Sequence, residues 1–292
     1  MKVLIAGAGG MVGRALAEYC AAAGDAVCAP DHHGLDITDA ASVAEVFDRE
    51  RPEAVFNCAA WTDVDGCELD PPRSHDVHAL AVETLAVNSR QQGATFLTIS
   101  TDYVFDGDKE GFYTQRDDPN PQSAYGTSKL EGEHRAQAAS ARTIIVRTGW
   151  IFGPGGRNFL SRVIELGRNG QPLKAIHDAY GTPTYAPGLV VRLRELVVRD
   201  LPGVYHVVNG GEGASFAEFA RAALAADGQT NPQIESVSAA TLSRPAPRPR
   251  NSRLRCLLSE ATGLLPLPHW HMALESWIAD SSIADCGLRI AD

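Results

Sequence analysis

A glycine-rich turn near the start of the chain constrains the fold more than any other feature. The apolar run at residues 3–6 enters this turn and an alanine-rich helical stretch leaves it; the turn reads Gly7-Ala8-Gly9-Gly10-Met11-Val12-Gly13. Glycines at its first, fourth and seventh positions allow the turn to close and a pyrophosphate to approach the backbone. The helix start then offers free amides to that anion. The order of strand, glycine turn and helix therefore predicts a dinucleotide-binding site.

Two acidic residues beyond the second predicted strand, residues 25–29, are candidates for binding the adenosine half of a dinucleotide. Asp31 stands where a carboxylate can accept hydrogen bonds from both ribose hydroxyls, although a solvated turn residue also fits there. Since a carboxylate repels a ribose 2′-phosphate, Asp31 favours NADH, and the two histidines that follow can soften that preference. Asp36 is a candidate for the adenine edge or for the cap of the helix that begins near Asp39.

Strands and helices alternate through the first half of the chain. After the first two strands, further strands are expected at 55–60, 95–100 and 143–146, and helices at 76–91 and 123–139. This alternation predicts an α/β fold with a Rossmann-like, doubly wound parallel sheet, in which ligands bind beyond the carboxyl ends of the strands. Small residues at one such end leave room for a flat cofactor; they are Ala59, Ala60 and Thr62.

The regular pattern loosens in the second half, where proline and glycine loops become frequent. We expect a dinucleotide-binding domain over residues 1–150, to which some later segments return. A smaller, irregular and mainly substrate-binding domain is expected over residues 151–292. Arg244, Arg248 and Arg250 lie in a proline-spaced part of this second domain. They can meet a substrate diphosphate, or they can be ordinary solvated loop charges.

The composition disfavours several functional classes. The 292-residue chain has a formal net charge of −10, which argues against nucleic-acid binding because phosphate affinity needs clustered Lys and Arg. No apolar run approaches the length of a membrane span. The six cysteines form no CxxC pair and are expected to be reduced thiols of a cytoplasmic protein. His269 and His271 have no evident third ligand, so no metal site is expected.

Residues 100–129 bring together groups that suit the reduction of a carbonyl. Tyr125 and Lys129 are four residues apart on a predicted helix and share one face. A phenol with an ordinary pKa of about 10 is a poor acid at neutral pH, and a neighbouring ammonium lowers that pKa. Thr101, at a neighbouring strand end, adds a hydroxyl donor for the oxygen that gains negative charge. We therefore predict Thr101, Tyr125 and Lys129 as catalytic residues, with Lys129 also holding the nicotinamide ribose.

With these motifs, the chain resembles the extended short-chain dehydrogenase/reductases and, within them, the dTDP-4-dehydrorhamnose reductases. The segments that carry the resemblance run from residue 2 to about residue 278 and are GAGGMVG, LDIT, NCAAWTDVDGCE, STDYVFDG, YGTSKLEGE, RTGWIFGPGGRNF, DAYGTPT, GVYHVVNGG, RPRNSRL and LPHW. STDYVFDG is shared with other extended members, whereas AWTDVD, RTGW and DxxGxPT are more specific.

The resemblance implies a reaction and a set of contacts. The 4-keto group of dTDP-4-dehydro-L-rhamnose would accept hydride from NADPH or NADH, while Tyr125 supplies the proton, Lys129 tunes it and Thr101 holds the oxygen. Positions that match the cofactor contacts of the family are Gly7, Gly10, Met11, Val12, Gly13, Asp31, Asp36, Ile37, Ala59, Ala60, Thr62, Tyr125 and Lys129. Positions that match its sugar contacts are Val64, Thr101, Asp102, Tyr103, Tyr125 and Trp150. For Trp150, packing in the core is the alternative.

Two features depart from the family pattern. His78 stands where the family usually has an asparagine that supports a helix distortion and a water-linked proton path. A histidine can relay protons too, or the path is altered. The family often prefers NADPH, whereas Asp31 argues for NADH, so the cofactor choice stays open.

Two other functions also stay open. One is reduction or epimerisation of another nucleotide 4-keto sugar. The other is a non-catalytic regulatory subunit of the methionine adenosyltransferase type, against which the intact Thr101, Tyr125 and Lys129 argue. The oligomeric state is not readable from the sequence, and a homodimer is one assembly that fits.

Overall fold

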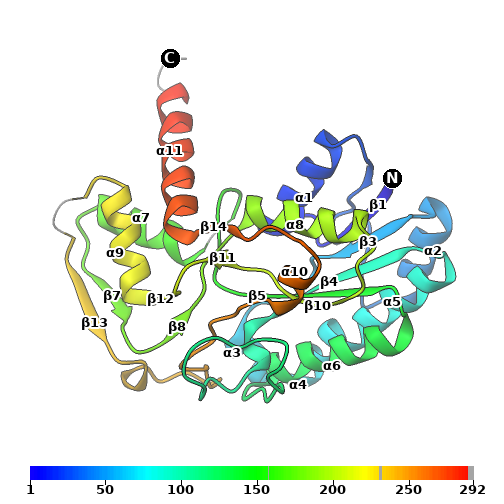
Figure 1. Ribbon diagram of the computed structural model, residues 1–292, viewed down its shortest axis with the longest axis horizontal. Coiled ribbons are helices and arrows are strands. Elements are labelled where there is room, and N and C mark those ends of the chain that lie inside the picture. The colour runs from blue at the N-terminus through cyan, green and yellow to red at the C-terminus, as the bar shows by residue number, and fades with distance from the viewer. Residues whose placement is uncertain (157, 230–231, 289–292) are drawn as a thin grey trace.

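A six-stranded parallel sheet forms the centre of the computed structural model, which describes residues 1–156, 158–229 and 232–288. The strand order is β10-β5-β4-β3-β1-β2, and every neighbouring pair is parallel (Figure 1). The strands are β1 (Lys2–Ala6), β2 (Ala26–Cys28), β3 (Ala54–Asn57), β4 (Thr95–Thr101), β5 (Thr143–Thr148) and β10 (Gly203–His206). The predicted doubly wound parallel sheet is confirmed.

Helices cover both faces of this sheet, which explains why its strands are nearly continuous apolar runs. Val3 and Ile5 of β1 face one core, and Leu4 faces the other. The first core is closed by α1 (Met11–Ala22) and α8 (Ala186–Val198), which lie above the sheet in Figure 1. The second core is closed by α2 (Ala40–Glu50), α5 (Ala81–Gln91) and α6 (Ala124–Ala139).

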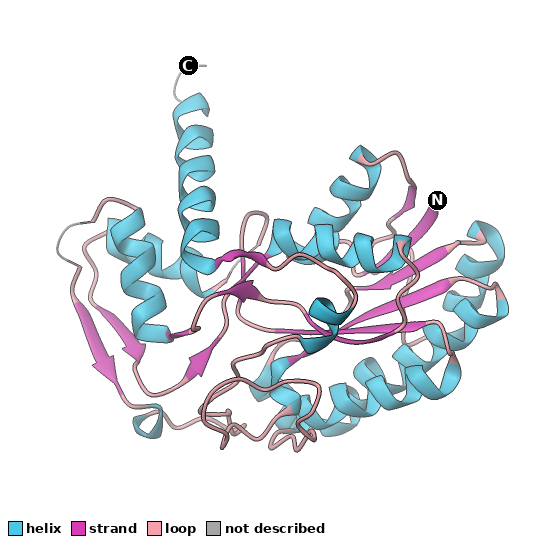
Figure 2. Ribbon diagram, viewed as in Figure 1, coloured by secondary structure: helices cyan, strands magenta, loops and turns pink. Residues whose placement is uncertain are grey.

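The second half of the chain contains elements around its own apolar cluster, drawn at the left of Figure 2. The helices α7 (Phe159–Arg168), α9 (Phe216–Ala226) and α11 (Trp270–Leu288) pack around this cluster, whereas α10 (Leu257–Ala261) packs on the first core beside β10. The strands of this half pair as β7 (Leu173–Ile176) with β13 (Ile234–Val237), β6 (Ile151–Phe152) with β9 (Thr184–Tyr185), β8 (Tyr180–Gly181) with β12 (Ala214–Ser215), and β11 (Asn209–Gly210) with β14 (Leu267–His269). Because α8 and β10 belong to the sheet layers, the chain crosses between its two halves more than once. The domain division at residue 150 stays a prediction.

The helix predicted at residues 76–91 is divided in the structure. A π-helical turn, η1 (Asp76–Leu80), joins α4 (Pro71–His75) to α5. A Cβ on Gly132 of α6 would overlap the carbonyl oxygen of His78, so the wide turn lies directly against α6. The remaining short helices are α3 (Val64–Leu69), η2 (Asp102–Val104) and η3 (Ala239–Thr241). π-Helical turns are often found at functional sites, and this one lies next to the helix that carries Tyr125 and Lys129.

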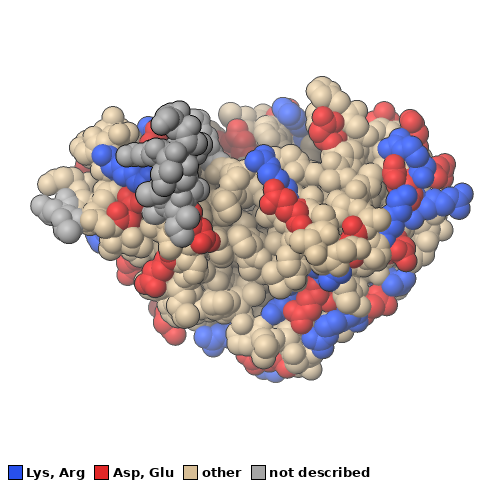
Figure 3. All heavy atoms as spheres, turned by 90° about the horizontal axis from the view of Figure 1, so that it is seen from above, with Lys and Arg blue, Asp and Glu red and all other residues tan. Residues whose placement is uncertain are grey.

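The surface is charged in some areas and neutral in others. Figure 3, which views the molecule from above, shows basic and acidic side chains interspersed at the end that carries the sheet, while the middle of this face is largely uncharged. None of the helices in the described part of the chain is long and apolar enough to cross a bilayer.

Candidate active site

The glycine turn between β1 and α1 is pressed against the end of β3. Gly7 has a φ of +77°, and a Cβ there would overlap the backbone of Ala59. A Cβ on Gly13 would overlap the carbonyl oxygen of Gly7. The N-cap of α1 is Gly10, and no side chain caps the first amides of the helix. These free amides, at a turn that only glycines can close, suit the pyrophosphate of a dinucleotide.

One cavity of about 750 Å³ extends from the glycine turn along the carboxyl ends of the central strands. Its volume is within the usual range for sites that bind small molecules. The predicted residues that line it are Gly10, Met11, Val12, Gly13, Ala59, Ala60, Thr62, Val64, Thr101, Asp102, Tyr103, Tyr125, Lys129 and Trp150. The structure therefore brings every predicted catalytic and substrate residue, and most of the predicted cofactor residues, into one cavity.

Four predicted cofactor residues do not line this cavity. Gly7 lies against the backbone of Ala59. Asp31 is exposed, and its Oδ1 accepts hydrogen bonds from the amides of His33 and Gly34 at 3.0 and 2.9 Å. The Asp36 carboxylate accepts hydrogen bonds from the amide and the hydroxyl of Thr38. Ile37 is buried in the core beneath α2. The cap of α2 is Asp39, so the alternative role for Asp36 as its cap is wrong. The cofactor roles of Asp31, Asp36 and Ile37 stay predictions.

The predicted catalytic residues come from two adjacent elements. Thr101 ends β4, and its hydroxyl accepts the Tyr103 amide at 3.1 Å and donates to Asp102 Oδ1 at 3.1 Å. Tyr125 and Lys129 lie one turn apart on α6. Lys129 is buried, and its ammonium donates to the carbonyl oxygen of Ile99 at 2.6 Å. This bond fixes the amine beneath the end of β4.

The electrostatics differ from the expectation that Lys129 lowers the pKa of Tyr125. Burial raises the pKa of Tyr125 above its ordinary value, and the Thr101 hydroxyl opposes that shift. Burial lowers the pKa of Lys129 to about 8, while the charge of Glu133 acts in the opposite direction. The phenol is therefore protonated at neutral pH, which is the form that a proton donor in a reduction requires.

His78 links three segments around the cavity. Its Nε2 accepts the Trp61 amide at 3.0 Å, so Nδ1 carries the ring proton and faces Ser128 Oγ at 3.0 Å. The ring also packs edge-on against Tyr125, with centroids 5.3 Å apart. Burial, together with the charge of Lys129, lowers the pKa of His78 to about 3. A neutral imidazole with both nitrogens engaged is suited to holding the loop before α3 against α6, rather than to relaying protons.

Asp102 presents an unusual carboxylate to the same cavity. The side chain is 3% exposed, and its Oδ2 has no hydrogen-bond partner among the residues that the structure describes. Burial raises the pKa of Asp102 to about 6, opposed by the hydrogen bond from Thr101. A buried acceptor without a partner is costly unless a ligand satisfies it. Asp102 is therefore suited to accept a hydrogen bond from a hydroxyl of the substrate.

A second cavity of about 520 Å³ adjoins the first, and both are bordered by Tyr103, Trp150 and Phe216. Trp150 has a φ of +50°, a strained value for a tryptophan, and its ring stacks on Phe216 with centroids 3.8 Å apart. The second cavity is also lined by the three arginines singled out from the sequence, Arg244, Arg248 and Arg250.

Sequence reasoning missed several residues of these cavities. Arg14, Phe159, Phe216 and Phe219 line the first cavity, and Asp178 and Tyr180 line the second. Phe159 lies in the quoted segment RTGWIFGPGGRNF, and Asp178 and Tyr180 lie in DAYGTPT, so these motifs could have indicated them. For Phe216 the signal is the capping box of Ser215 and Glu218, which marks the start of α9. In the part of the chain that the structure describes, no cluster of His, Cys, Asp or Glu is arranged to hold a metal ion.

Comparisons with known proteins agree with this geometry. The family described as "RmlD substrate binding domain" matches residues 1–283. A dTDP-4-dehydrorhamnose reductase from Streptomyces griseus is 36% identical over 97% of this chain and 94% of its own length. A dTDP-4-keto-6-deoxy-D-glucose reductase from Streptomyces niveus is 32% identical over 93% of this chain and 94% of its own length.

A solved structure is similarly close. The dTDP-4-dehydrorhamnose reductase of Bacillus anthracis, crystallised in complex with NADP, is 33% identical and superposes with a TM-score of 0.92, covering 96% of this chain and 99% of its own. Sequence and fold thus agree over nearly the whole length. The chain belongs to the RmlD substrate binding domain family, that of the dTDP-4-dehydrorhamnose reductases within the extended short-chain dehydrogenase/reductases.

Proposed function

We propose that this protein reduces the 4-keto group of dTDP-4-dehydro-L-rhamnose to give dTDP-L-rhamnose, with NADPH or NADH as the reductant. The observation that carries the proposal is the single cavity that joins the glycine turn to Thr101, Tyr125 and Lys129. A glycine turn alone is common, and so is a tyrosine four residues before a lysine. Their convergence on one cavity is what a nicotinamide-dependent ketoreductase requires.

The residues of the chain divide the work of the reaction. The bound nicotinamide supplies the hydride. The Tyr125 phenol holds the carbonyl oxygen together with the Thr101 hydroxyl, which turns from Asp102 to the substrate, and the phenol donates its proton as that oxygen gains negative charge. Lys129, fixed by the Ile99 carbonyl, keeps a positive charge beside the site and donates to the nicotinamide ribose. The Asp102 carboxylate accepts a hydrogen bond from a sugar hydroxyl and orients the ring.

The second cavity receives the nucleotide end of the substrate. It adjoins the sugar end at Trp150 and contains Arg244 and Arg250, whose charges complement a diphosphate. Tyr180 and Phe216 offer aromatic surfaces to the thymine ring. Trp150 forms the wall between the two ends, and its ring suits the apolar face of a 6-deoxy sugar.

Reduction of a different dTDP-linked 4-keto sugar is the second candidate. It is favoured by the similarity to the Streptomyces niveus enzyme, whose name specifies another dTDP-4-keto sugar. The regulatory-subunit alternative is disfavoured, because Thr101, Tyr125 and Lys129 all face the cavity that a substrate would enter.

A panel of nucleotide 4-keto sugars, assayed with NADPH and with NADH, tests the proposal. We expect cofactor oxidation with dTDP-4-dehydro-L-rhamnose and a much lower kcat/KM with the others. Thr101→Val, which keeps the shape and removes the hydroxyl, should lower kcat by roughly 10²-fold or more. Oxidation with another sugar only would favour the second candidate, and no oxidation with any sugar would overturn both.

We also propose that the enzyme works in the cytoplasm. The described cysteines are free thiols, as a reducing compartment requires, and Cys286 lies outside the described side chains. A homodimer is the assembly to test, and light scattering of the purified protein measures it directly.

A further inference from the structure

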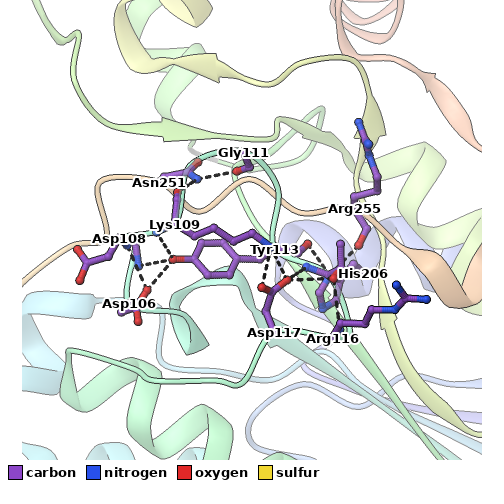
Figure 4. A network of polar contacts seen from close by, with 12 residues as sticks. Asp106, Asp108, Lys109, Gly111, Tyr113, Arg116, Asp117, His206, Asn251 and Arg255 are labelled. Carbon is purple, nitrogen blue, oxygen red and sulfur yellow. Dashed lines mark hydrogen bonds and ion pairs between the residues drawn. The ribbon is translucent and has the colours of Figure 1, made fainter.

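Residues 244–255, which we call the strap, connect the two halves of the molecule. On one side, the Tyr180 amide donates to the Arg250 carbonyl, and the Ser252 amide donates to the Tyr180 carbonyl, both at 2.8 Å. On the other side, Asn251 Nδ2 donates to the carbonyl oxygens of Lys109 and Gly111, both at 2.6 Å (Figure 4). The strap also borders the second cavity.

The far end of the strap is held just as firmly. The Tyr113 amide donates to the Arg253 carbonyl at 2.7 Å, and the Arg255 amide donates back to Tyr113 at 2.9 Å. Figure 4 shows Tyr113 within a network that includes Asp106, His206 and Asn251. This end therefore has many anchors, whereas its beginning, around Arg248, depends on different contacts.

Those contacts converge on one carboxylate in the other half of the chain. Asp65 Oδ1 and Oδ2 accept hydrogen bonds from Arg248 Nη1 and Nη2 at 2.5 and 2.9 Å. Asp65 Oδ1 also accepts the Ala246 amide at 3.1 Å. Arg248 in turn donates to the Ala246 carbonyl at 2.7 Å. The Arg248 and Asp65 side chains are 21% and 34% exposed, so the pair is partly shielded from solvent.

The pair lies where the sugar and nucleotide ends of the site meet. Asp65 follows Val64, which lines the first cavity, and Arg248 lines the second. Tyr103, which borders both cavities, lies beside Arg248; burial raises the pKa of Tyr103 to about 12, and Arg248 opposes that shift. Both terminal nitrogens of the Arg248 guanidinium already bind the Asp65 carboxylate. An arginine that binds a phosphate commonly uses the same two-pronged geometry.

We propose that Asp65 and Arg248 form a latch that holds the strap over the active site, and that they act as positioning residues rather than as ligands of the substrate. This proposal rests on the proposed nucleotide-sugar function and refines it. The latch fixes the strap at the junction of the two cavities, so that Arg244 and Arg250 are presented to the diphosphate in advance. Of the three arginines, Arg248 is the one that forms an ion pair with a carboxylate among the described residues.

The two roles of Arg248 predict opposite effects of removing Asp65. If Arg248 is a latch, loss of either partner releases the strap and weakens nucleotide binding. If Arg248 is instead a phosphate ligand, loss of Asp65 frees its guanidinium and leaves binding unchanged or tighter. A double-mutant cycle of Asp65→Asn and Arg248→Gln, with the affinity for dTDP as the readout, separates them.

We expect each single variant to weaken dTDP binding by roughly tenfold, and the double variant to be no weaker than either one. The affinity for NADPH should stay within about twofold of wild type, because the glycine turn proposed to bind it is remote in sequence from the strap. This measurement also shows that each variant is folded. Asp65→Glu should recover part of the lost dTDP affinity.

Asp25→Asn is the matched control. Asp25 and Arg194 form another two-pronged pair between distant segments, at 2.7 and 3.1 Å, and neither residue lines the two cavities. This variant should lower the melting temperature without changing dTDP affinity. If the wild type binds dTDP and Asp65→Asn binds it equally well or more tightly, the latch is overturned and the proposed substrate class is not. Absence of dTDP binding by the wild type would overturn the proposed substrate class and the latch with it.

Discussion

Replacement of His78 tests how the active-site helices are held together. In His78→Ala the partly buried amide of Trp61 loses its acceptor, whereas the Ser128 hydroxyl keeps its bonds to Ser74 and to the Tyr125 carbonyl. A polar group left without a partner costs about 1–3 kcal/mol, so the free energy of unfolding should fall by about that amount. Because Trp61 lies between Ala60 and Thr62 of the cavity wall, the KM for the cofactor should rise as well.

The pH dependence of stability gives a sharper test of the same residue. The folded pKa of His78, about 3, is below the unfolded value of 6.5, so its contribution is complete above pH 6.5 and is lost as the pH falls toward 3. Between pH 7 and pH 5 the wild type should lose about 2 kcal/mol through this group. In His78→Asn, which cannot ionise, that part of the acid sensitivity should disappear.

Urea unfolding of wild type and His78→Asn at both pH values measures this difference. The imidazole signal of His78 is assigned in ¹⁵N NMR as the one that is absent from His78→Asn. In the wild type this signal should show the neutral Nδ1–H tautomer throughout pH 5–8. A His78 signal that titrates within this range would refute the assignment as a neutral clamp. It would favour the alternative of a histidine that relays protons to the site.

Further predictions concern residues of the two cavities. Tyr125→Phe should lower kcat by roughly 10²–10⁴-fold with little change in cofactor affinity; a variant that keeps more than about a tenth of wild-type kcat would show that the phenol is not the acid. Asp31→Ala should raise kcat/KM with NADPH relative to NADH; a wild-type preference for NADPH of about tenfold or more would contradict the repulsion argument. Trp150→Ala should raise the KM for the sugar nucleotide at a near-normal melting temperature, whereas a fall of about 3–5 kcal/mol in stability with normal kinetics would identify a core residue. Since the folded pKa of Asp102, about 6, exceeds its unfolded value of 3.8, its ionised form destabilises the protein at neutral pH. The free energy of unfolding of Asp102→Asn should therefore exceed that of the wild type by about 3 kcal/mol at pH 7, and this excess should shrink as the pH falls through 6 toward 4. A difference in stability that does not change with pH would contradict the buried carboxylate.

Local patterns predicted the features that depend on neighbouring residues. The glycine turn, the spacing of Tyr125 and Lys129, and the alternation of strands and helices all lie within short stretches, and the sheet follows from them. The sequence also predicted which strand ends meet, because the carboxyl ends of parallel strands share one edge. Thr101, Ala59 and the glycine turn accordingly line one cavity.

Features that depend on distant packing were not predictable in this way. Asp65 and Arg248 are 183 positions apart, and no periodicity relates them. The π-helical turn at His78 has no signature in the helical pattern, and only the family resemblance, in which this position supports a helix distortion, pointed to it. The pKa of Tyr125 followed burial rather than the nearby lysine, a balance that depends on the surrounding residues and not on spacing.

Transfer of deuterium from the cofactor tests the central claim most directly. NADPH in which both hydrogens at C4 of the nicotinamide are deuterium would be incubated with the protein and dTDP-4-dehydro-L-rhamnose. The sugar product would then be analysed by NMR and mass spectrometry. The proposed reaction predicts one deuterium at C4 of the sugar in dTDP-L-rhamnose, with the same label but a far lower rate for Tyr125→Phe. A product without deuterium at C4, or no product from the folded wild-type protein, would contradict the proposed function.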